Sequence, residues 1–296
     1  LIDVRTGMEV IRIDRMEEKV IVRDLKPGAQ SVERYDCLLL SPGAEPVRPN
    51  IPGAGSSRVF TLRSLGDMDV IKEFVDTAKP ARAVVIGAGY IGLEMTEALA
   101  ERGIKVILVE LMNQVMGPLD PEMAALLNQQ IAMHGVEMRL GISVTELREE
   151  KGGITAILNT GETVAADFVM MNVGVKPETR LAREAGLSIG ETGGILVDDH
   201  MRTSDPKIFA VGDAVEVKDF VGGFKTLIPL AGPANRQGRI AADNIFGRES
   251  VYRHTQGTAV VKVFELTAGM TGLSEKTLAR RAVPYEKIYV HPASLS

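Results

Sequence analysis

Hydrophobic and polar residues alternate near the start of the chain in a way that is typical of β-strands. The alternation runs through Glu9–Ile13 and again through Lys19–Arg23, and a period of two places successive side chains on opposite faces of a strand. A Lys-Pro-Gly turn begins at Lys26. The apolar run from Tyr35 to Leu40 then predicts a buried strand. We therefore expect mainly β-structure in this part of the chain.

Between residues 81 and 110 the hydrophobic period changes from strand to helix and back. Ala83–Ile86 is a short apolar run, as in a strand that is buried on both faces. A second apolar run, Val106–Val109, ends at Glu110. The segment between them has an apolar helix face formed by Ile91, Met95, Ala98 and Leu99. This order predicts a strand–turn–helix–strand unit in a parallel sheet.

Other segments continue the alternation of strands and helices. Their periods and turn signals predict, in chain order, a helix capped by Ser64, a helix from Pro121 to Gly135, a strand at 136–140, a hairpin turning at 159–161, strands at 168–173, 195–198 and 208–211, a helix from Pro233 to Phe246, a strand at 258–266 and a helix capped by Ser274. This order predicts an α/β fold class.

The composition narrows the class of protein. The chain has 296 residues, a net charge of −5 and one cysteine. The length is sufficient for two or three domains, and the charge argues against a nucleic acid partner. No apolar run is long enough to cross a membrane, and a single cysteine is in keeping with a reducing cytosol. The first residue is Leu1 rather than Met, and we expect the natural protein to extend beyond both ends.

The turn after Ala83–Ile86 has three glycines at a spacing that suits a dinucleotide. Gly87 allows a tight turn, Gly89 has no side chain to hold a pyrophosphate away from the backbone, and Gly92 lets the helix pack closely on the strand. The free N–H groups at the helix N-terminus favour phosphate. The alternative is a glycine-rich turn in an ordinary α/β protein, but the complete unit around it favours a dinucleotide site.

Glu110 lies about twenty residues beyond the glycines, where an acid that binds the adenosine ribose is expected. Its carboxylate would repel the 2′-phosphate of NADP by roughly 1 kcal/mol in water and about 4 kcal/mol at an intermediate dielectric. The next four residues contain no Arg or Lys to reverse this. We therefore predict a preference for NADH. The alternative is an acid that is simply solvated at a strand end.

The remaining polar residues show no second catalytic motif. The histidines are scattered along the chain without the spacing of a metal site, and the Ser, Asp and His residues form no nucleophile elbow. We expect no metal ion. The histidines are His134, His200, His254 and His291.

Four stretches of the chain resemble one known family. They are LLLSPGAEPVRPNIPG (38–53), VVIGAGYIGLE (84–94), TSDPKIFAVGDA (203–214) and PLAGPANRQGRIAADNI (229–245). Together they resemble the FAD-dependent pyridine nucleotide-disulfide oxidoreductases. With residues 257–276, the resemblance points to the branch of coenzyme A disulfide reductases, NADH oxidases and NADH-dependent persulfide reductases.

The resemblance implies a Rossmann-like NAD domain inserted in an incomplete FAD domain, followed by part of an α+β C-terminal interface domain. The implied segments are an FAD segment at 1–65, an NAD(H)-binding domain at 66–188, a second FAD segment at 189–250 and a partial interface or dimerisation domain at 251–296.

Roles for particular residues are also implied by the resemblance. For FAD, Asp213 is implied to accept a hydrogen bond from a ribityl hydroxyl, while Leu230 and Ala231 would lie near the flavin ring. The residues implied to contact FAD are Ser41, Gly43, Ala44, Gly212, Asp213, Leu230 and Ala231.

For NADH, Tyr90 resembles a tyrosine that covers the flavin when nicotinamide is absent, and Glu94 would hydrogen-bond the nicotinamide end. Gly174 and Val175 would lie beside the nicotinamide. The alternative for Tyr90 and Glu94 is a helix position without a ligand. The residues expected to contact NADH are Gly87, Gly89, Tyr90, Ile91, Gly92, Glu94, Glu110, Gly174 and Val175.

The chain departs from the family pattern in two places. The FAD-pyrophosphate glycine motif and the redox cysteine, both expected upstream of residue 1, are absent. Cys37 is no substitute, because no Lys, Arg or His lies beside it in sequence to lower its pKa. We expect Cys37 to be a small buried apolar residue. No catalytic residue can be nominated within this chain.

The sequence therefore predicts an FAD-dependent oxidoreductase that takes hydride from NADH to flavin and passes electrons to a disulfide or persulfide, such as coenzyme A disulfide. A cytoplasmic homodimer is implied by the resemblance. One alternative is an NADH oxidase that reduces oxygen or peroxide. Another is a non-catalytic NADH-binding fragment.

Overall fold

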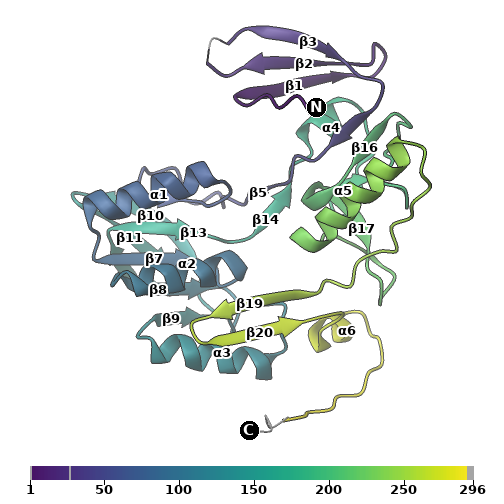
Figure 1. Cartoon of the computed structure of the whole chain (residues 1–296). Helices are drawn as coiled ribbons and strands as arrows, with labels where there is room; N and C mark the ends of the chain where they lie inside the picture. Colours follow the sequence, from purple (N-terminus) through teal and green to yellow (C-terminus); the bar gives the residue numbers. More distant parts are fainter. Residues whose placement is uncertain (1, 27, 292–296) are drawn as a thin grey trace. The chain divides into compact units, whose positions relative to one another are not determined.

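The computed structural model describes residues 2–26 and 28–291 (Figure 1). These residues form two compact units. Unit 1 comprises Leu1–Asn50, Phe60–Ala78 and Asn172–Ala259, and unit 2 comprises Ile51–Val59, Lys79–Met171 and Val260–Ser296. The segments follow each other in an interleaved order along the chain. The four-part domain division expected from the resemblance stays a prediction.

A parallel sheet organises unit 2, as the apolar runs predicted. Its strand order is β6-β13-β7-β8-β9, and β13, β7, β8 and β9 pair in parallel. The strands are β6 (Val59–Phe60), β13 (Phe168–Met171), β7 (Arg82–Ile86), β8 (Lys105–Glu110) and β9 (Glu137–Leu140). The interior residues of β7 and β13 are almost fully buried, which explains their continuous apolar sequence.

Two helices follow β7 and β8 in the chain, namely α2 (Tyr90–Glu101) and α3 (Pro121–Met133). Both predicted helices are confirmed. The predicted apolar face of α2 is wrong at Ala98, which is exposed, whereas Leu93 and Thr96 are buried. Thr96 can be buried because its hydroxyl donates to the Gly92 carbonyl at 2.8 Å.

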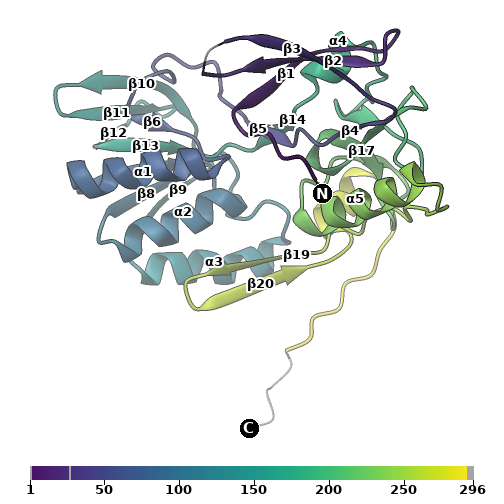
Figure 2. The ribbon, with the colours of Figure 1, turned by 45° about the horizontal axis from the view of Figure 1, so that its top comes forward.

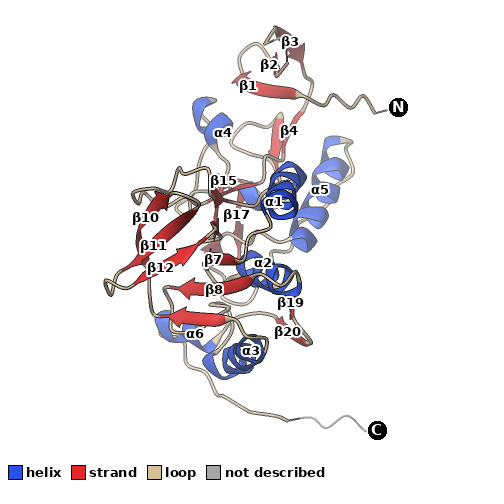
Figure 3. Cartoon of the chain, turned by 90° about the vertical axis from the view of Figure 1, so that its left-hand side faces the viewer, coloured by secondary structure: helices blue, strands red, loops and turns tan. Residues whose placement is uncertain are grey.

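An antiparallel sheet completes the central part of unit 2 (Figure 3). It consists of β10 (Val144–Glu150), β11 (Gly153–Leu158) and β12 (Thr163–Ala166). The hairpin predicted at 159–161 joins β11 to β12, and Gly161 takes the left-handed conformation there, with φ of 86°. β10 was not predicted, because its charged sequence carries little hydrophobic pattern.

The last elements of unit 2 are β19 (Ala259–Val263), β20 (Leu266–Met270) and α6 (Glu275–Arg280), with β20 lying against α3 (Figure 2). The single strand predicted at 258–266 is wrong. The chain reverses at Phe264, which has a φ of 52°, and β19 pairs with β20. The His134 ring stacks on Phe264 with centroids 3.8 Å apart.

In the residues that the structure describes, unit 1 contains several small sheets and the helices α1, α4 and α5. Its first sheet is antiparallel and consists of β1 (Met8–Asp14), β2 (Lys19–Asp24) and β3 (Gln30–Arg34). The other strands pair as β4 (Leu38–Leu40) with β16 (Ile208–Ala210), β5 (Ala44–Pro46) with β14 (Val175–Pro177), and β15 (Ile195–Leu196) with β17 (Val215–Lys218) and β18 (Lys225–Thr226). The helices are α1 (Leu65–Ala78), α4 (Arg180–Glu184) and α5 (Ala231–Ile245).

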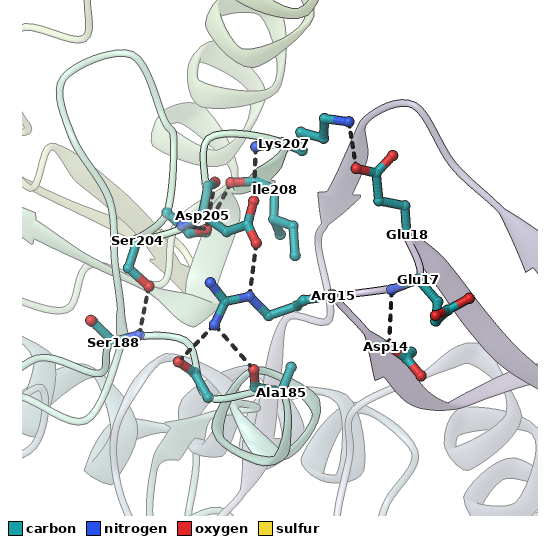
Figure 4. A network of polar contacts seen from close by, with 12 residues as sticks. Asp14, Arg15, Glu17, Glu18, Ala185, Ser188, Ser204, Asp205, Lys207 and Ile208 are labelled. Carbon is teal, nitrogen blue, oxygen red and sulfur yellow. Dashed lines mark hydrogen bonds and ion pairs between the residues drawn. The ribbon is translucent and has the colours of Figure 1, made fainter.

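Buried residues of β1, β2, β4, β16, β17 and α5 share one hydrophobic core. Arg15, in the turn after β1, adds polar contacts to this packing (Figure 4). Its Nε donates to the Asp205 carboxylate at 2.8 Å, and a second guanidinium nitrogen donates to the carbonyls of Ala185 and Gly186 at 3.3 and 3.1 Å. Lys207 and Glu18 form a neighbouring ion pair at 2.5 Å. Arg15 therefore joins the first sheet to the end of α4 and to the segment before β16.

The prediction for Cys37 is wrong. Cys37 is exposed and lies in a bend just before β4, so it is not a buried apolar residue. The strand begins at Leu38 rather than Tyr35.

The part of the chain that the structure describes contains no candidate for a membrane-spanning helix or for a metal site. None of its helices is long and apolar enough to cross a membrane. No group of His, Cys, Asp and Glu side chains in the same residues could hold a metal ion.

Candidate functional site

The three-glycine turn lies in unit 2, between the carboxyl end of β7 and the N-terminus of α2. Gly87 has a φ of 97°, which favours glycine, and its N–H donates to the Val109 carbonyl of β8 at 2.8 Å. Gly89 is the N-cap of α2. A Cβ added to Gly89 would meet no described atom within 4 Å beyond its own chain neighbours. Open space beside an N-cap glycine suits the close approach of a phosphate.

Glu110 ends β8 beside this turn and fixes its geometry. One carboxylate oxygen accepts from the Ala88 N–H at 2.6 Å, and the other accepts from the Met112 N–H at 2.8 Å. The structure therefore brings Glu110 to the glycine turn, as a ribose-binding acid requires. It also shows that the carboxylate already has two backbone donors in the protein.

The loop after β8 supports the same turn, and sequence reasoning missed it. The Met116 N–H donates to the Ala88 carbonyl at 2.8 Å. Met116 is 1% exposed and has a φ of 51°. Gln114 donates to the Leu119 carbonyl at 3.0 Å and closes the loop. No local sequence signal identifies Met116, because its position depends on its contact with the glycine turn, which lies far from it in the sequence.

Three predicted NADH residues lie at the start of α2. Tyr90 is its first residue, and its hydroxyl lies 3.6 Å from the Met270 sulfur of β20. Burial raises the pKa of Tyr90. Ile91 is half-buried, whereas Glu94 is exposed, so both are accessible to a ligand. Their contacts with NADH stay predictions.

Gly174 and Val175 belong to unit 1. Both are exposed. Gly174 has a φ of 109°, and its carbonyl accepts from the Val47 N–H at 2.9 Å. Val175 begins β14, which pairs with β5. Their placement beside a nicotinamide stays a prediction.

The residues predicted to contact FAD are all in unit 1. β4 and β16 are parallel neighbours, and the Val211 N–H donates to the Leu40 carbonyl at 3.0 Å. Ser41 follows β4 and Gly212 follows β16 closely, so the structure brings these two strand ends together. Parallel strands present such ends at one edge, where cofactors bind in open α/β sheets.

Asp213 lies in the single 3₁₀ turn Gly212–Ala214. It is half-buried, and burial raises the pKa of its carboxyl group. A hydroxyl donor on a ligand would stabilise the ionised form, so the residue fits a ribityl hydroxyl.

The other predicted FAD residues are accessible. Gly43 has a φ of 75°, and Ala44 begins β5 opposite Pro177 of β14. Leu230 is the N-cap of α5, and Ala231 is its first residue. The roles of these four residues in binding FAD stay predictions.

Gln237 is a second residue that sequence reasoning missed. It is 2% exposed, and its side-chain oxygen accepts from the Gly212 N–H at 2.7 Å. A signal was present, because Gln237, Ile240 and Ala241 have the spacing of one helix face. A polar residue on a buried face needs a hydrogen-bond partner.

Comparison with known proteins accounts for nearly the whole chain. The family model described as "Pyridine nucleotide-disulphide oxidoreductase" matches residues 1–238. An NADH oxidase of Methanocaldococcus jannaschii is 37% identical over 96% of this chain and 63% of its own length. An NAD(P)H sulfur oxidoreductase (CoA-dependent) of Pyrococcus abyssi is 34% identical over 93% of this chain and 60% of its own length. The chain therefore spans about three-fifths of these two relatives.

Solved structures agree with this assignment. Reduced CoADR-RHD of Bacillus anthracis is 47% identical, with a TM-score of 0.92, over 94% of this chain and 50% of that one. A NAD-dependent persulfide reductase from A. fulgidus is 37% identical, with a TM-score of 0.91, over 95% of this chain and 52% of that one. The α/β fold class is confirmed, and this chain belongs to the pyridine nucleotide-disulphide oxidoreductase family.

Proposed function

We propose that this chain is part of an FAD-dependent oxidoreductase that oxidises NADH and delivers the electrons to a disulfide or persulfide. The observation that carries the proposal is the glycine turn, with its open space beside Gly89 and with Glu110 hydrogen-bonded to the Ala88 N–H at 2.6 Å. The names of similar proteins support it, since they include an NAD(P)H sulfur oxidoreductase and a NAD-dependent persulfide reductase.

The residues of unit 2 would bind and select the dinucleotide. The first N–H groups of α2 would bind the pyrophosphate, because the N-terminal N–H groups of a helix have no intrahelical partner. Gly89 would let the phosphates reach them. Glu110 would accept hydrogen bonds from the ribose hydroxyls of NADH. Its negative charge would repel the 2′-phosphate of NADPH. Tyr90, Ile91 and Glu94 would contact NADH, and Glu94 would hydrogen-bond its nicotinamide end. In unit 1, Gly174 and Val175 would lie beside a nicotinamide.

The residues of unit 1 would hold part of FAD. Asp213 would accept a hydrogen bond from a ribityl hydroxyl, and Gly212 would allow the close approach of the cofactor. Ser41, Gly43 and Ala44 would line its path, while Leu230 and Ala231 would lie near the ring. When bound, FAD supplies the acceptance of a hydride from NADH and the transfer of its two electrons to the S–S bond of a disulfide or persulfide. The protein's part is to orient the cofactor and exclude water.

The second candidate is an NADH oxidase with oxygen or peroxide as acceptor. It is supported by the M. jannaschii relative of that name and uses the same dinucleotide turn. The third, a non-catalytic NADH-binding fragment, would retain unit 2 without flavin. We further propose a cytoplasmic homodimer and the four-part division 1–65, 66–188, 189–250 and 251–296, all of which the resemblance implies.

A spectroscopic and kinetic experiment tests this function. The protein expressed from its complete coding sequence is purified, and its absorbance is recorded in the flavin bands. NADH oxidation is then followed with and without oxygen, each in the presence and absence of coenzyme A disulfide or a persulfide. Flavin absorbance and NADH consumption that requires coenzyme A disulfide or a persulfide are expected. Colourless protein that FAD cannot reconstitute contradicts the proposal. Consumption that requires oxygen and ignores disulfides identifies an NADH oxidase instead.

A further inference from the structure

Gln237 is unusual among the residues of α5. It is 2% exposed and lies on the face that also buries Ile240 and Ala241. An apolar residue would pack there without a partner, whereas an amide that leaves water needs a hydrogen bond to offset its desolvation. A glutamine at this position is therefore explained by what it binds.

Its partner is Gly212, which lies two residues beyond the end of β16. The ladder between β4 and β16 closes with the Val211 N–H on the Leu40 carbonyl at 3.0 Å. Gly212 then has a φ of 80°, which turns the chain away from the strand direction. The Gly212 N–H donates instead to Gln237 Oε1 at 2.7 Å. The last ladder hydrogen bond, from Val211, is thus followed by a hydrogen bond from Gly212 to α5.

The hydrogen bond fixes one side of a very short turn. Gly212–Ala214 is a single 3₁₀ turn, and one isolated turn has little stability of its own. Ala214 is fully buried on the far side. Asp213 lies between these two anchored neighbours, so its backbone direction depends on both.

We propose that Gln237 is a positioning residue for flavin binding, which fixes the Gly212 N–H and thereby aims the Asp213 carboxylate at the cofactor. This inference rests on the proposed function, because Asp213 is taken to bind FAD. It gives α5 a specific role, because its residue Gln237 would act through the Gly212–Ala214 turn rather than by touching the ribityl chain.

FAD affinity in a set of variants tests the proposal. Gln237→Met keeps the length of the side chain but removes the acceptor, and Gln237→Asn keeps the amide but shortens its reach. Each is expected to weaken FAD binding about tenfold, as for the loss of one well-placed hydrogen bond. Gln237→Glu retains an acceptor and is expected to stay within about threefold of wild type. Gln129→Met, at an exposed position of α3, is the matched control and is expected to have no effect.

A double-mutant cycle separates positioning from general destabilisation. If Gln237 acts through Asp213, Gln237→Met adds nothing further to the FAD affinity lost in Asp213→Asn. Additive losses, or unchanged affinity in both Gln237→Met and Gln237→Asn, overturn the inference. Wild-type protein that binds no FAD contradicts the proposed function itself. The titrations use the protein from its complete coding sequence, and thermal unfolding without FAD confirms that each variant is folded.

Discussion

Glu110 Oε2 accepts a hydrogen bond from the Ala88 N–H at 2.6 Å, joining the end of β8 to the glycine turn after β7. The other carboxylate oxygen accepts a hydrogen bond from the Met112 N–H at 2.8 Å. One side chain therefore supports the turn and also carries the negative charge that would meet the adenosine ribose. These two roles can be separated by experiment.

Replacing Glu110 with Gln keeps an acceptor for Ala88 but removes the charge. We expect the preference for NADH over NADPH to fall about tenfold or more, because a repulsion of roughly 1 to 4 kcal/mol is lost. Glu110→Ala is expected to show the same relaxation and also to lose about 1 kcal/mol of stability, since two N–H groups lose their acceptor. Dissociation constants for both nucleotides and urea unfolding measure these effects. An unchanged NADH/NADPH ratio in Glu110→Gln would remove the assigned role.

The Arg15–Asp205 pair makes stability depend on pH. Burial alone would raise the pKa of Asp205, but the hydrogen bonds from Arg15 and from the Lys207 N–H bring that pKa below its ordinary value. A lowered pKa contributes stability above the unfolded pKa, and this contribution is lost as pH falls through the folded pKa.

We therefore expect Arg15→Met to lose about 1–2 kcal/mol of unfolding free energy at pH 7 and less in acid, since the pair is partly exposed. Arg12→Met is the control, because its ion pair with Asp14 is long, at 3.5 Å, and exposed at the arginine. Equal losses for Arg15→Met and Arg12→Met across the pH range would contradict this account.

His134 couples the β19–β20 turn to α3. Its Nδ1 lies 2.9 Å from the Gln130 carbonyl and its Nε2 lies 3.1 Å from the Glu265 carboxylate. The Gln130 carbonyl and then the Glu265 charge raise the pKa of His134. A raised pKa adds stability below the unfolded pKa, and that addition is lost as pH rises through the folded pKa.

The expected result is an NMR titration of the His134 ring above the ordinary histidine range, which Glu265→Gln brings down. Glu97 also contributes charge near this ring, so Lys262, which pairs with Glu97 at 2.9 Å, is left unchanged. A His134 titration that Glu265→Gln does not alter would show that the contact is absent in solution.

Cys37 is exposed, and we expect a maleimide to label it in the folded protein at the rate of an accessible thiol. Cys37→Ser should leave NADH oxidation unchanged, because the residue is not the redox cysteine of the proposed function. Loss of disulfide reduction in Cys37→Ser would reverse that assignment. Labelling only after unfolding would contradict the exposed position.

The sequence predicted those features that local pattern controls. Apolar periods predicted β7 and α2, and the backbone freedom of glycine predicted the turn between them and the end of the helix at Gly103. The 159–161 hairpin follows from its turn signal. The helix-face spacing of Gln237 signals that its side chain is buried, but the partners of Gln237 and Met116 could not be predicted, because they lie on other elements. Cys37 and Phe264 were placed wrongly for a related reason, since apolar runs do not show where a strand starts or reverses.

The central claim is that a dinucleotide phosphate occupies the open space beside Gly89. Gly89→Ala tests it directly, because the new methyl group meets no described atom within 4 Å and Gly89 has an ordinary φ of −81°. Stability should change by about 1 kcal/mol or less, the cost of alanine at an N-cap. Gly55→Ala, at another glycine with no described atom within 4 Å, is the matched control.

The decisive measurement is the dissociation constant of NADH for wild type, Gly89→Ala and Gly55→Ala. We expect this constant to rise at least about tenfold for Gly89→Ala alone, in a protein that remains folded. An NADH affinity that Gly89→Ala leaves unchanged would show that no phosphate binds beside Gly89.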